Sequence, residues 1–428
     1  MFTVPFGKGH LKFNLPKGFT GHVVESKTLP PIADVPAEVR HWLRHPVVSP
    51  PLRELAGASD KVCIVFTDIT RASPDYLLVP PLLEELEAAG VERNDITLIC
   101  GIGMHRPSTD KEKAAKLGAE IVRNYRVIDN EPQNPAALVD LGKTPSGIPL
   151  TVHKIAYEAD LLIATGIVEP HQYAGYSGGR KTLAVGAAGE EMIAYSHGPQ
   201  IVDHPGTRLG QIEGNPFHEA VTEAARRAGL RFIVNVVIDD NKNVVAVRAG
   251  ATEEAFMELV GIARSIFEVT IPHQYDVAVA GVGFPKDANL YQASRAASYL
   301  FFAPTQVVRD GGYIIVPAGC EEGPGEGVGE QRFFETMCAA ADCQQILDDA
   351  RKYGYKPGEQ RAFVMAKVLE KNKVIVVGSK DPDVIRQAKM IPAATMDEAF
   401  AIVRADIGPR ADVLVVPHAL LTLPIVQS

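Results

Sequence analysis

The fold and the candidate site meet in residues 159–181, ADLLIATGIVEPHQYAGYSGGRK. The run from Ala159 to Val168 is apolar, and it has the length of a buried strand. The stretch from Glu169 to Lys181 then brings a histidine, three glycines and a lysine beside an arginine, and His197 follows sixteen residues later. Glycine allows a close approach of backbone to a bulky ligand, and a lysine beside a cation can become an amine nucleophile. This segment predicts a site for a large, anionic cofactor that could be held covalently.

Outward from this stretch, short apolar runs alternate with segments of helical period. The first series predicts strands at 61–66, 96–101 and 161–165, helices at 76–89 and 109–117, and a hairpin formed by 232–238 and 244–247. Thr109 and Glu112 have the spacing of a capping box at the start of the second helix. Such alternation is typical of an α/β fold with a mostly parallel, Rossmann-like sheet flanked by helices.

A second series begins near residue 275, with strands predicted at 277–281, 313–317 and 374–378 and helices at 289–302, 331–341 and 358–370. A chain of 428 residues exceeds the size at which a single core stops growing. We therefore predict two domains, 1–270 and 271–428, with the boundary near 268–274 and the active site in the cleft between them. The run 413–417 predicts a last strand, and the segment 408–428 could return to the N-terminal domain.

Composition excludes several classes of protein. The net charge of −9, with no compensating lysine and arginine stripe, argues against a nucleic-acid partner. No apolar run approaches the ~18 residues of a membrane helix, and the N-terminus has no signal-peptide pattern. The five cysteines form no Cys-x-x-Cys pair. We expect a reduced, cytoplasmic protein with no membrane partner.

Polar clusters follow several of the predicted strands. They are Asp68-Ile69-Thr70-Arg71, His105-Arg106, His171, and Lys286-Asp287 with Gln292. In open α/β sheets, ligands bind outside the carboxyl ends of the strands, so these clusters could converge on one cleft. For any one of them a turn, a cap or (for Arg71 and Arg106) a surface ion pair is an equally good interpretation. Their shared position favours the functional one.

Two familiar motifs are approached but not matched. Gly101-Ile102-Gly103 begins a dinucleotide fingerprint, but Arg106 stands at the third glycine, which argues against conventional NAD binding. The stretch from Gly175 to Thr182 approaches a phosphate loop, but Arg180 replaces the glycine before the lysine. A phosphate- or nucleotide-binding protein remains the alternative. His105, His171 and His197 are the candidate functional histidines, and their spacing leaves a metal open.

Taken together, these segments resemble the lactate racemase family, whose enzymes are built around a nickel-pincer nucleotide. The matching pieces are residues 68–71, 103–106 and 169–181, His197, Pro205-Gly206, Asn215-Pro216 and residues 285–292. The resemblance covers nearly the whole chain, and residues 171–181 are its most specific part.

The resemblance implies a role for each matching residue. Lys181 would tether the cofactor, a nickel pincer complex of pyridinium-3-thioamide-5-thiocarboxylic acid mononucleotide, and His197 would be the protein ligand to nickel. His105 and His171 would be paired acid and base groups. The other cofactor contacts would be Asp68, Thr70, Gly178 and Gly179, and the substrate contacts would be Arg71, Tyr173, Tyr291, Gln292 and Arg295.

The implied activity is racemisation or epimerisation of a 2-hydroxy acid, with the Cα hydrogen moving as hydride because this carbon acid is too weak for ordinary proton abstraction. Two positions depart from the lactate pattern: Arg295 stands where a lysine is expected, and Tyr173 where a phenylalanine is expected. Both add hydrogen-bonding capacity, which predicts a substrate more polar than lactate, such as malate or an aldonic acid. The implied partners are the cofactor-biosynthesis enzymes, and a homo-oligomer is possible. A cofactor-binding protein without racemase activity is a further alternative, but the two histidines argue against it.

Overall fold

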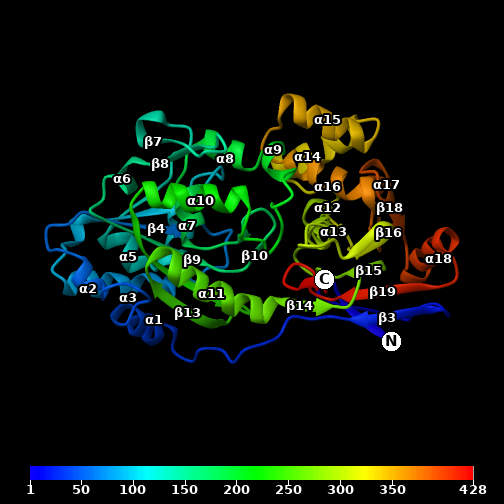
Figure 1. Cartoon of the computed structure of the whole chain (residues 1–428), viewed down its shortest axis with the longest axis horizontal. Helices are drawn as coiled ribbons and strands as arrows, with labels where there is room; N and C mark the ends of the chain where they lie inside the picture. Colours follow the sequence, from blue (N-terminus) through cyan, green and yellow to red (C-terminus); the bar gives the residue numbers. More distant parts are fainter. Residues whose placement is uncertain (428) are drawn as a thin grey trace. The chain divides into compact units, whose positions relative to one another are not determined.

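The computed structural model describes residues 1–427, which divide into two compact units (Figure 1). The N-terminal unit comprises Thr28–His197 and Gln211–Ile266, and the C-terminal unit comprises Met1–Lys27, Gly198–Gly210 and the chain from Phe267 onward. The division predicted from sequence put the first 27 residues in the N-terminal domain. In the structure they lie in the C-terminal unit, because strand β3 (Phe19–Val23) pairs with β19 (Ala411–Val416). No helix within residues 1–427 combines the length and apolar composition that a membrane crossing requires.

The N-terminal unit is built on a six-stranded sheet of order β13-β12-β9-β4-β5-β6. Its strands are β4 (Val62–Thr67), β5 (Ile96–Gly101), β6 (Arg126–Asp129), β9 (Leu161–Ile167), β12 (Leu230–Ile238) and β13 (Val244–Gly250). Only β13 is antiparallel to its neighbour, and it forms the predicted hairpin with β12. From β4 the chain adds β5 and β6 on one side, and it adds β9 and β12 on the other. The strand order therefore reverses between β4 and β9, which is where ligands bind in doubly wound sheets.

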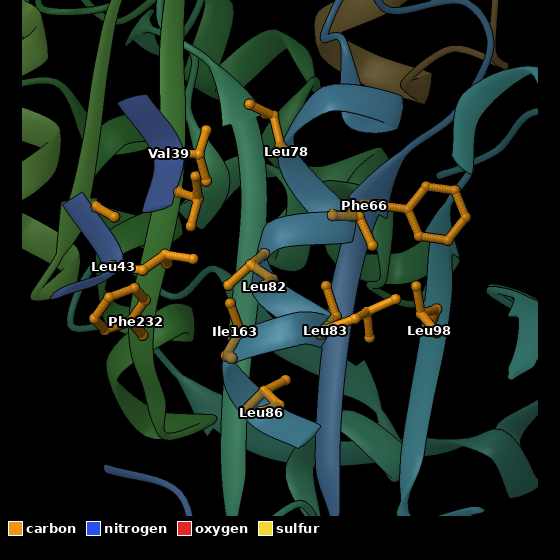
Figure 2. Packing of buried hydrophobic residues seen from close by; sticks show 14 of the residues in the cluster. Val39, Leu43, Phe66, Leu78, Leu82, Leu83, Leu86, Leu98, Ile163 and Phe232 are labelled. Carbon is orange, nitrogen blue, oxygen red and sulfur yellow. The ribbon is translucent and has the colours of Figure 1, made fainter. Parts of the chain in front are cut away.

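One face of this sheet is covered by α1 (Val35–Arg44) and α3 (Asp75–Ala88). Figure 2 shows Leu78, Leu82 and Leu86 of α3 packed toward strand side chains such as Ile163 and Phe66. Alternate strand residues point to this face because successive side chains on a strand alternate in direction. The packing fixes how α3, and the loop that leads into it, meets the strand ends.

The remaining elements of this unit precede, connect or follow these strands. They are α2 (Leu52–Leu55), α4 (Asp110–Leu117), α5 (Ala119–Asn124), β7 (Leu138–Lys143), β8 (Pro149–His153), α6 (Lys154–Tyr157), β10 (Pro170–His171), β11 (Gly175–Tyr176), α7 (Gly179–Lys181), the π-helical turn η3 (Thr182–Gly186), α8 (Glu190–Ser196), α10 (Pro216–Arg227) and α11 (Thr252–Phe267), with short 3₁₀ turns η1 (Arg93–Asp95) and η2 (Pro135–Ala137). The capping box predicted at Thr109 is confirmed, since its side chain and that of Glu112 cap each other's backbone.

The C-terminal unit has a second six-stranded sheet, of order β18-β17-β16-β15-β19-β3, and every pairing in it is parallel. Its strands, besides β3 and β19, are β15 (Tyr275–Ala280), β16 (Val308–Pro317), β17 (Lys373–Val377) and β18 (Ile391–Ala393). The predicted last strand is thus β19, and it joins this sheet rather than the sheet of the N-terminal unit. The α/β fold class predicted from sequence is confirmed for both units.

Helices and short strand pairs complete this unit. They are β1 (Phe2–Phe6), β2 (Gly9–Phe13), α9 (Pro199–Val202), β14 (Glu268–Ile271), α12 (Leu290–Ala293), α13 (Arg295–Phe301), α14 (Val328–Ala339), α15 (Cys343–Tyr353), α16 (Gln360–Lys371), α17 (Pro382–Gln387), α18 (Met396–Ile407) and β20 (Leu423–Val426).

Candidate functional site

The candidate site of the N-terminal unit lies at the carboxyl ends of three neighbouring strands, β9, β4 and β5. The polar clusters that the sequence placed after strands follow these three: Asp68–Arg71 after β4, His105 after β5 and His171 after β9. Because parallel strands end at the same edge of a sheet, the fold gathers these clusters at the point where the strand order reverses.

The loop after β4 is organised around Asp68, whose side chain is buried, with 4% of the residue exposed. One carboxylate oxygen accepts the hydroxyl of Thr70 at 2.7 Å, and the other is 2.7 Å from Nδ1 of His105. Burial opposes the charge of this carboxyl, but the hydrogen bonds from His105 and Thr70 prevail and hold its pKa below the usual value. Asp68 therefore accepts hydrogen bonds as an anion.

Arg71 lies three residues further along this loop, exposed to solvent. Within residues 1–427 no carboxylate forms an ion pair with its guanidinium. Arg106, the other candidate arginine, pairs with Glu112 at 2.6 Å on the surface. The surface-ion-pair interpretation therefore holds for Arg106, and Arg71 is the guanidinium left to bind an anion.

His105 and His171 are held in opposite tautomers. The Asp68 carboxylate can only accept, so Nδ1 of His105 carries the proton and the lone pair of the neutral ring is on Nε2. His171 lies at the end of β10, in a hairpin with β11, and its Nδ1 accepts the backbone N–H groups of Tyr173 at 3.2 Å and Ala174 at 3.1 Å. Its neutral ring therefore carries the proton on Nε2. One ring is prepared to accept a proton and the other to donate one.

The backbone that leads into Lys181 passes very close to the sheet. Gly178 has φ of +157°, and a Cβ there would lie 2.8 Å from the Phe256 ring. A Cβ on Gly166 of β9 would lie 2.8 Å from the Gly179 amide nitrogen. Only glycine fits at these positions without displacing neighbours. Gly178, which was predicted to contact the cofactor, and Gly166, which was not predicted, thus allow α7 to lie against β9 with Lys181 as its last residue.

The surroundings of Lys181 and His197 lower the pKa values of both side chains. Burial, assisted by the positive charge of Arg71, lowers the pKa of the Lys181 amine to about 7. Burial, together with the nearby Lys181 cation, lowers the pKa of His197 to about 4. Nδ1 of His197 lies 2.9 Å from the Ile193 carbonyl oxygen, so its proton sits there and the lone pair is on Nε2. A neutral amine and a neutral imidazole are the forms needed for covalent attachment and for metal ligation.

Aromatic contacts connect His171 and His197 through Tyr173 and Phe217. Tyr173 packs edge-on against His197, with 5.5 Å between ring centroids, and lies 5.9 Å from the His171 ring. Phe217 contacts the His197 ring at 5.0 Å, and the Asn215 amide donates to the Tyr173 carbonyl at 2.8 Å. Phe217 was missed by the sequence analysis because its position on α10 is that of an ordinary core residue. Only its neighbours Asn215 and Pro216, which belong to the segments that resemble the lactate racemase family, pointed to this position.

These residues fit a tethered cofactor better than a metal held by protein alone. Within residues 1–427 no three histidine, cysteine, aspartate or glutamate side chains come together as a metal site. A metal at His197 would therefore need further ligands from a bound group. Lys181, which has a lowered amine pKa, could hold such a group, and the chemistry of the site agrees with the cofactor that the family resemblance implies.

The phosphate-loop alternative fails on Arg180. Its guanidinium is buried, lies 3.7 Å from the centre of the Phe256 ring and donates to the hydroxyl of Thr222. It therefore serves to pack α7 against α10 and α11, and it fills the place where a phosphate loop needs a glycine.

Three predicted substrate residues, Tyr291, Gln292 and Arg295, belong to the C-terminal unit. They lie on α12 and α13, after β15, where the strand order of the second sheet reverses between β15 and β19. Arg295 donates to the Tyr299 hydroxyl at 2.9 Å and to the Gln292 side-chain oxygen at 3.4 Å. Neither of these partners carries a charge.

Buried Arg361 was not among the predicted residues. It donates to Ser298 at 2.9 Å and lies over the Tyr291 ring at 5.6 Å. Nothing in the local sequence of α16 distinguishes it from a surface arginine.

The chain is similar to known proteins along most of its length. Residues 6–210 match the lactate racemase N-terminal domain, and residues 272–423 match the lactate racemase C-terminal domain. The chain is 31% identical over 423 residues to a lactate racemase of Thermoanaerobacterium thermosaccharolyticum, covering 97% of each protein. It is 33% identical over 387 residues to a lactate racemase of Lactiplantibacillus plantarum, covering 89% of each.

Solved structures give the same picture. The lactate racemase apoprotein of T. thermosaccharolyticum superposes with a TM-score of 0.87 at 30% identity, covering 100% of this chain and 99% of that one. A protein from Thermotoga maritima, at 18% identity and a TM-score of 0.68, shares the fold, with coverage of 94% and 100%. The two domain matches together, and each of the two relatives, span most of the chain, and on these grounds the protein is a member of the lactate racemase family.

Proposed function

We propose that this protein is a racemase or epimerase of a 2-hydroxy acid that uses a nickel-pincer nucleotide tethered to Lys181. The observation that carries the proposal is the pair of opposite tautomers at His105 and His171. Racemisation runs in both directions, so it needs one group that takes the hydroxyl proton and another that returns it. The family relatives, which are lactate racemases, support the same reaction type.

The chain's own residues would divide the work as follows. Arg71 would bind the substrate carboxylate through its planar guanidinium and so orient the Cα–H bond. Nε2 of His105 would take the hydroxyl proton, and the Asp68 carboxylate would stabilise the resulting imidazolium. His171 would return a proton from Nε2 on the other face, and in the reverse direction the two exchange roles.

Two further residues would hold the cofactor. The neutral amine of Lys181 would carry it covalently, and Nε2 of His197 would ligate nickel. When bound, the cofactor supplies an electron-poor acceptor for the Cα hydrogen as hydride. Asp68, Thr70, Gly178 and Gly179 are proposed to line the same site.

We propose a substrate more polar than lactate. The Tyr173 ring contacts those of His171 and His197, and its hydroxyl adds hydrogen-bonding capacity that a polar substrate group can use and the methyl group of lactate cannot. On the family resemblance, Arg295 would contact the substrate together with Tyr291 and Gln292. Its planar guanidinium suits bidentate contact with a second carboxylate or with neighbouring hydroxyls. Malate and aldonic acids have the required groups.

The test uses protein produced together with the cofactor-biosynthesis enzymes. Its intact mass should exceed that of the polypeptide, and Lys181→Ala should abolish the excess, whereas Lys111→Ala, an exposed lysine on α4, should retain it. Racemisation of lactate, malate and an aldonic acid is then followed by chiral chromatography. Turnover of none of them by adduct-bearing protein would refute the function, and lactate as the best substrate would refute only the substrate assignment.

A further inference from the structure

A buried ion pair lies beneath the loop that carries Asp68 and Arg71. Asp75, at the start of α3, is completely buried, and Lys116, near the end of α4, is 5% exposed. The Lys116 amine lies 2.8 Å from the Asp75 carboxylate. Buried ion pairs are seldom retained for stability, because apolar residues of similar volume stabilise a protein as well or better. The pair therefore requires another explanation.

The Asp75 carboxylate joins the two strands between which the strand order reverses. One of its oxygens accepts the hydroxyl of Thr67, the last residue of β4, at 2.6 Å. The other accepts the hydroxyl of Thr165 of β9 at 2.6 Å and that of Ser73 at 3.2 Å. The carboxylate thus ties the end of β4 to the end of β9 directly below the candidate site.

The Lys116 amine holds the loop between β4 and α3 from the same side. It donates to the carbonyl oxygens of Ser73 at 2.6 Å and Arg71 at 3.3 Å, and to the Thr67 hydroxyl at 2.9 Å. The Arg71 amide in turn donates to the Asp68 carbonyl at 3.1 Å. Both ends of the residue 68–73 loop are therefore fixed by contacts that lead to one ion pair.

The network also reaches the backbone beside Lys181. The carbonyl oxygen of Thr165, whose side chain binds Asp75, accepts the hydroxyl of Thr182 at 2.8 Å. Thr182 follows Lys181 directly, and begins η3. One buried carboxylate is thus connected to the loop that carries Arg71 and, through Thr165, to the turn that directly follows Lys181.

We propose that Asp75 and Lys116 are positioning residues, which hold Arg71 and the Asp68–His105 pair in register with Lys181. The inference rests on the proposed function, but it concerns residues that touch neither substrate nor cofactor. Its physical basis is preorganisation, since a displacement of about 1 Å at a carboxylate-binding arginine can cost on the order of a hundredfold in rate.

The variants are Lys116→Met, Asp75→Asn and the double variant Asp75→Leu/Lys116→Met. The double variant removes both charges together, so it should fold even where a single change leaves one buried charge unpaired. The matched control is Lys113→Met on the same helix, which breaks the 2.7 Å ion pair of Lys113 with Asp129 of β6 rather than a contact with the 68–73 loop.

Two measurements decide the question. Steady-state kinetics, with turnover normalised to adduct-bearing protein, should show that the Asp75 and Lys116 variants have a KM for the hydroxy acid at least tenfold above that of wild type and a lower kcat. Hydrogen exchange of the peptide spanning residues 68–74 in apoprotein should be at least tenfold faster. The Lys113→Met control should show wild-type KM and wild-type exchange of that peptide.

A double-mutant cycle with Arg71→Ala separates positioning from a general loss of stability. If Lys116 acts through Arg71, combining Lys116→Met with Arg71→Ala should cost much less than the product of the two separate losses. A double variant Asp75→Leu/Lys116→Met with wild-type KM and wild-type exchange at 68–74 would overturn the proposal. The exchange measurement needs no substrate, so a failure of the proposed function alone would leave faster exchange in place.

Discussion

The lowered pKa of the Lys181 amine predicts an unusual reactivity that can be measured without any cofactor. A pKa near 7 replaces the ordinary 10.5 because burial disfavours the ammonium and Arg71 repels it. At pH 7 about half of the Lys181 side chains are then neutral, against roughly three in ten thousand for an ordinary lysine. Lys181 should therefore present on the order of a thousand times more free amine than an exposed lysine. Arg71→Gln removes the repulsion, so it should raise the pKa.

The assay is brief acetylation of apoprotein across pH 5 to 10, with each lysine quantified by peptide mass spectrometry. Acetylation of Lys181 should reach half its plateau near pH 7, whereas that of exposed Lys111 should still be rising at pH 9. The midpoint for Lys181 should move to higher pH in Arg71→Gln and stay near the wild-type value in Arg71→Lys, which keeps the charge. A wild-type Lys181 profile that follows the Lys111 profile would refute the argument from burial and charge.

The remaining predictions concern the metal, the acid–base pair, substrate binding and stability. His197→Ala should lose nickel on dialysis, whereas His105→Ala and His171→Ala should retain it and lose ~10²–10⁴-fold in turnover; equal nickel loss in all three, by metal analysis, would contradict this division. Arg71→Ala should weaken transition-state binding by ~2–5 kcal/mol, measured as a fall in kcat/KM, while the covalent adduct persists. Near-normal kinetics would exclude Arg71 as the group that binds the substrate carboxylate. Burial, with the nearby Arg180 charge, lowers the pKa of His218 from 6.5 to about 4. Between pH 6.5 and 4 the unfolded chain therefore binds a proton that the folded chain does not, and the free energy of unfolding falls as pH falls. Urea unfolding of apoprotein measures how much the free energy of unfolding falls between pH 7 and pH 5. This fall should be about 2 kcal/mol smaller in His218→Gln than in wild type. An identical pH dependence in both proteins would be the contrary result.

Much of the fold was predictable because it depends on local patterns. β4 and β5 lie within one residue of the strands expected from apolar runs, and the Thr109 capping box depends only on neighbouring residues. The candidate residues were likewise predictable as types, since a polar cluster after an apolar strand is visible without any long-range information. The family resemblance supplied their expected roles.

Tertiary structure decided which residues meet. The tautomer of His105 depends on Asp68, which lies 37 residues earlier, and the Asp75–Thr165 hydrogen bond spans 90 residues. The pairing of β3 with β19 joins the two ends of the chain, and it moved the first 27 residues into the C-terminal unit. Residue types and periodicity specify what a segment can form, but such contacts arise only when distant segments pack together. The low pKa of Lys181 has the same origin, because burial and the approach of Arg71 are properties of the folded chain alone.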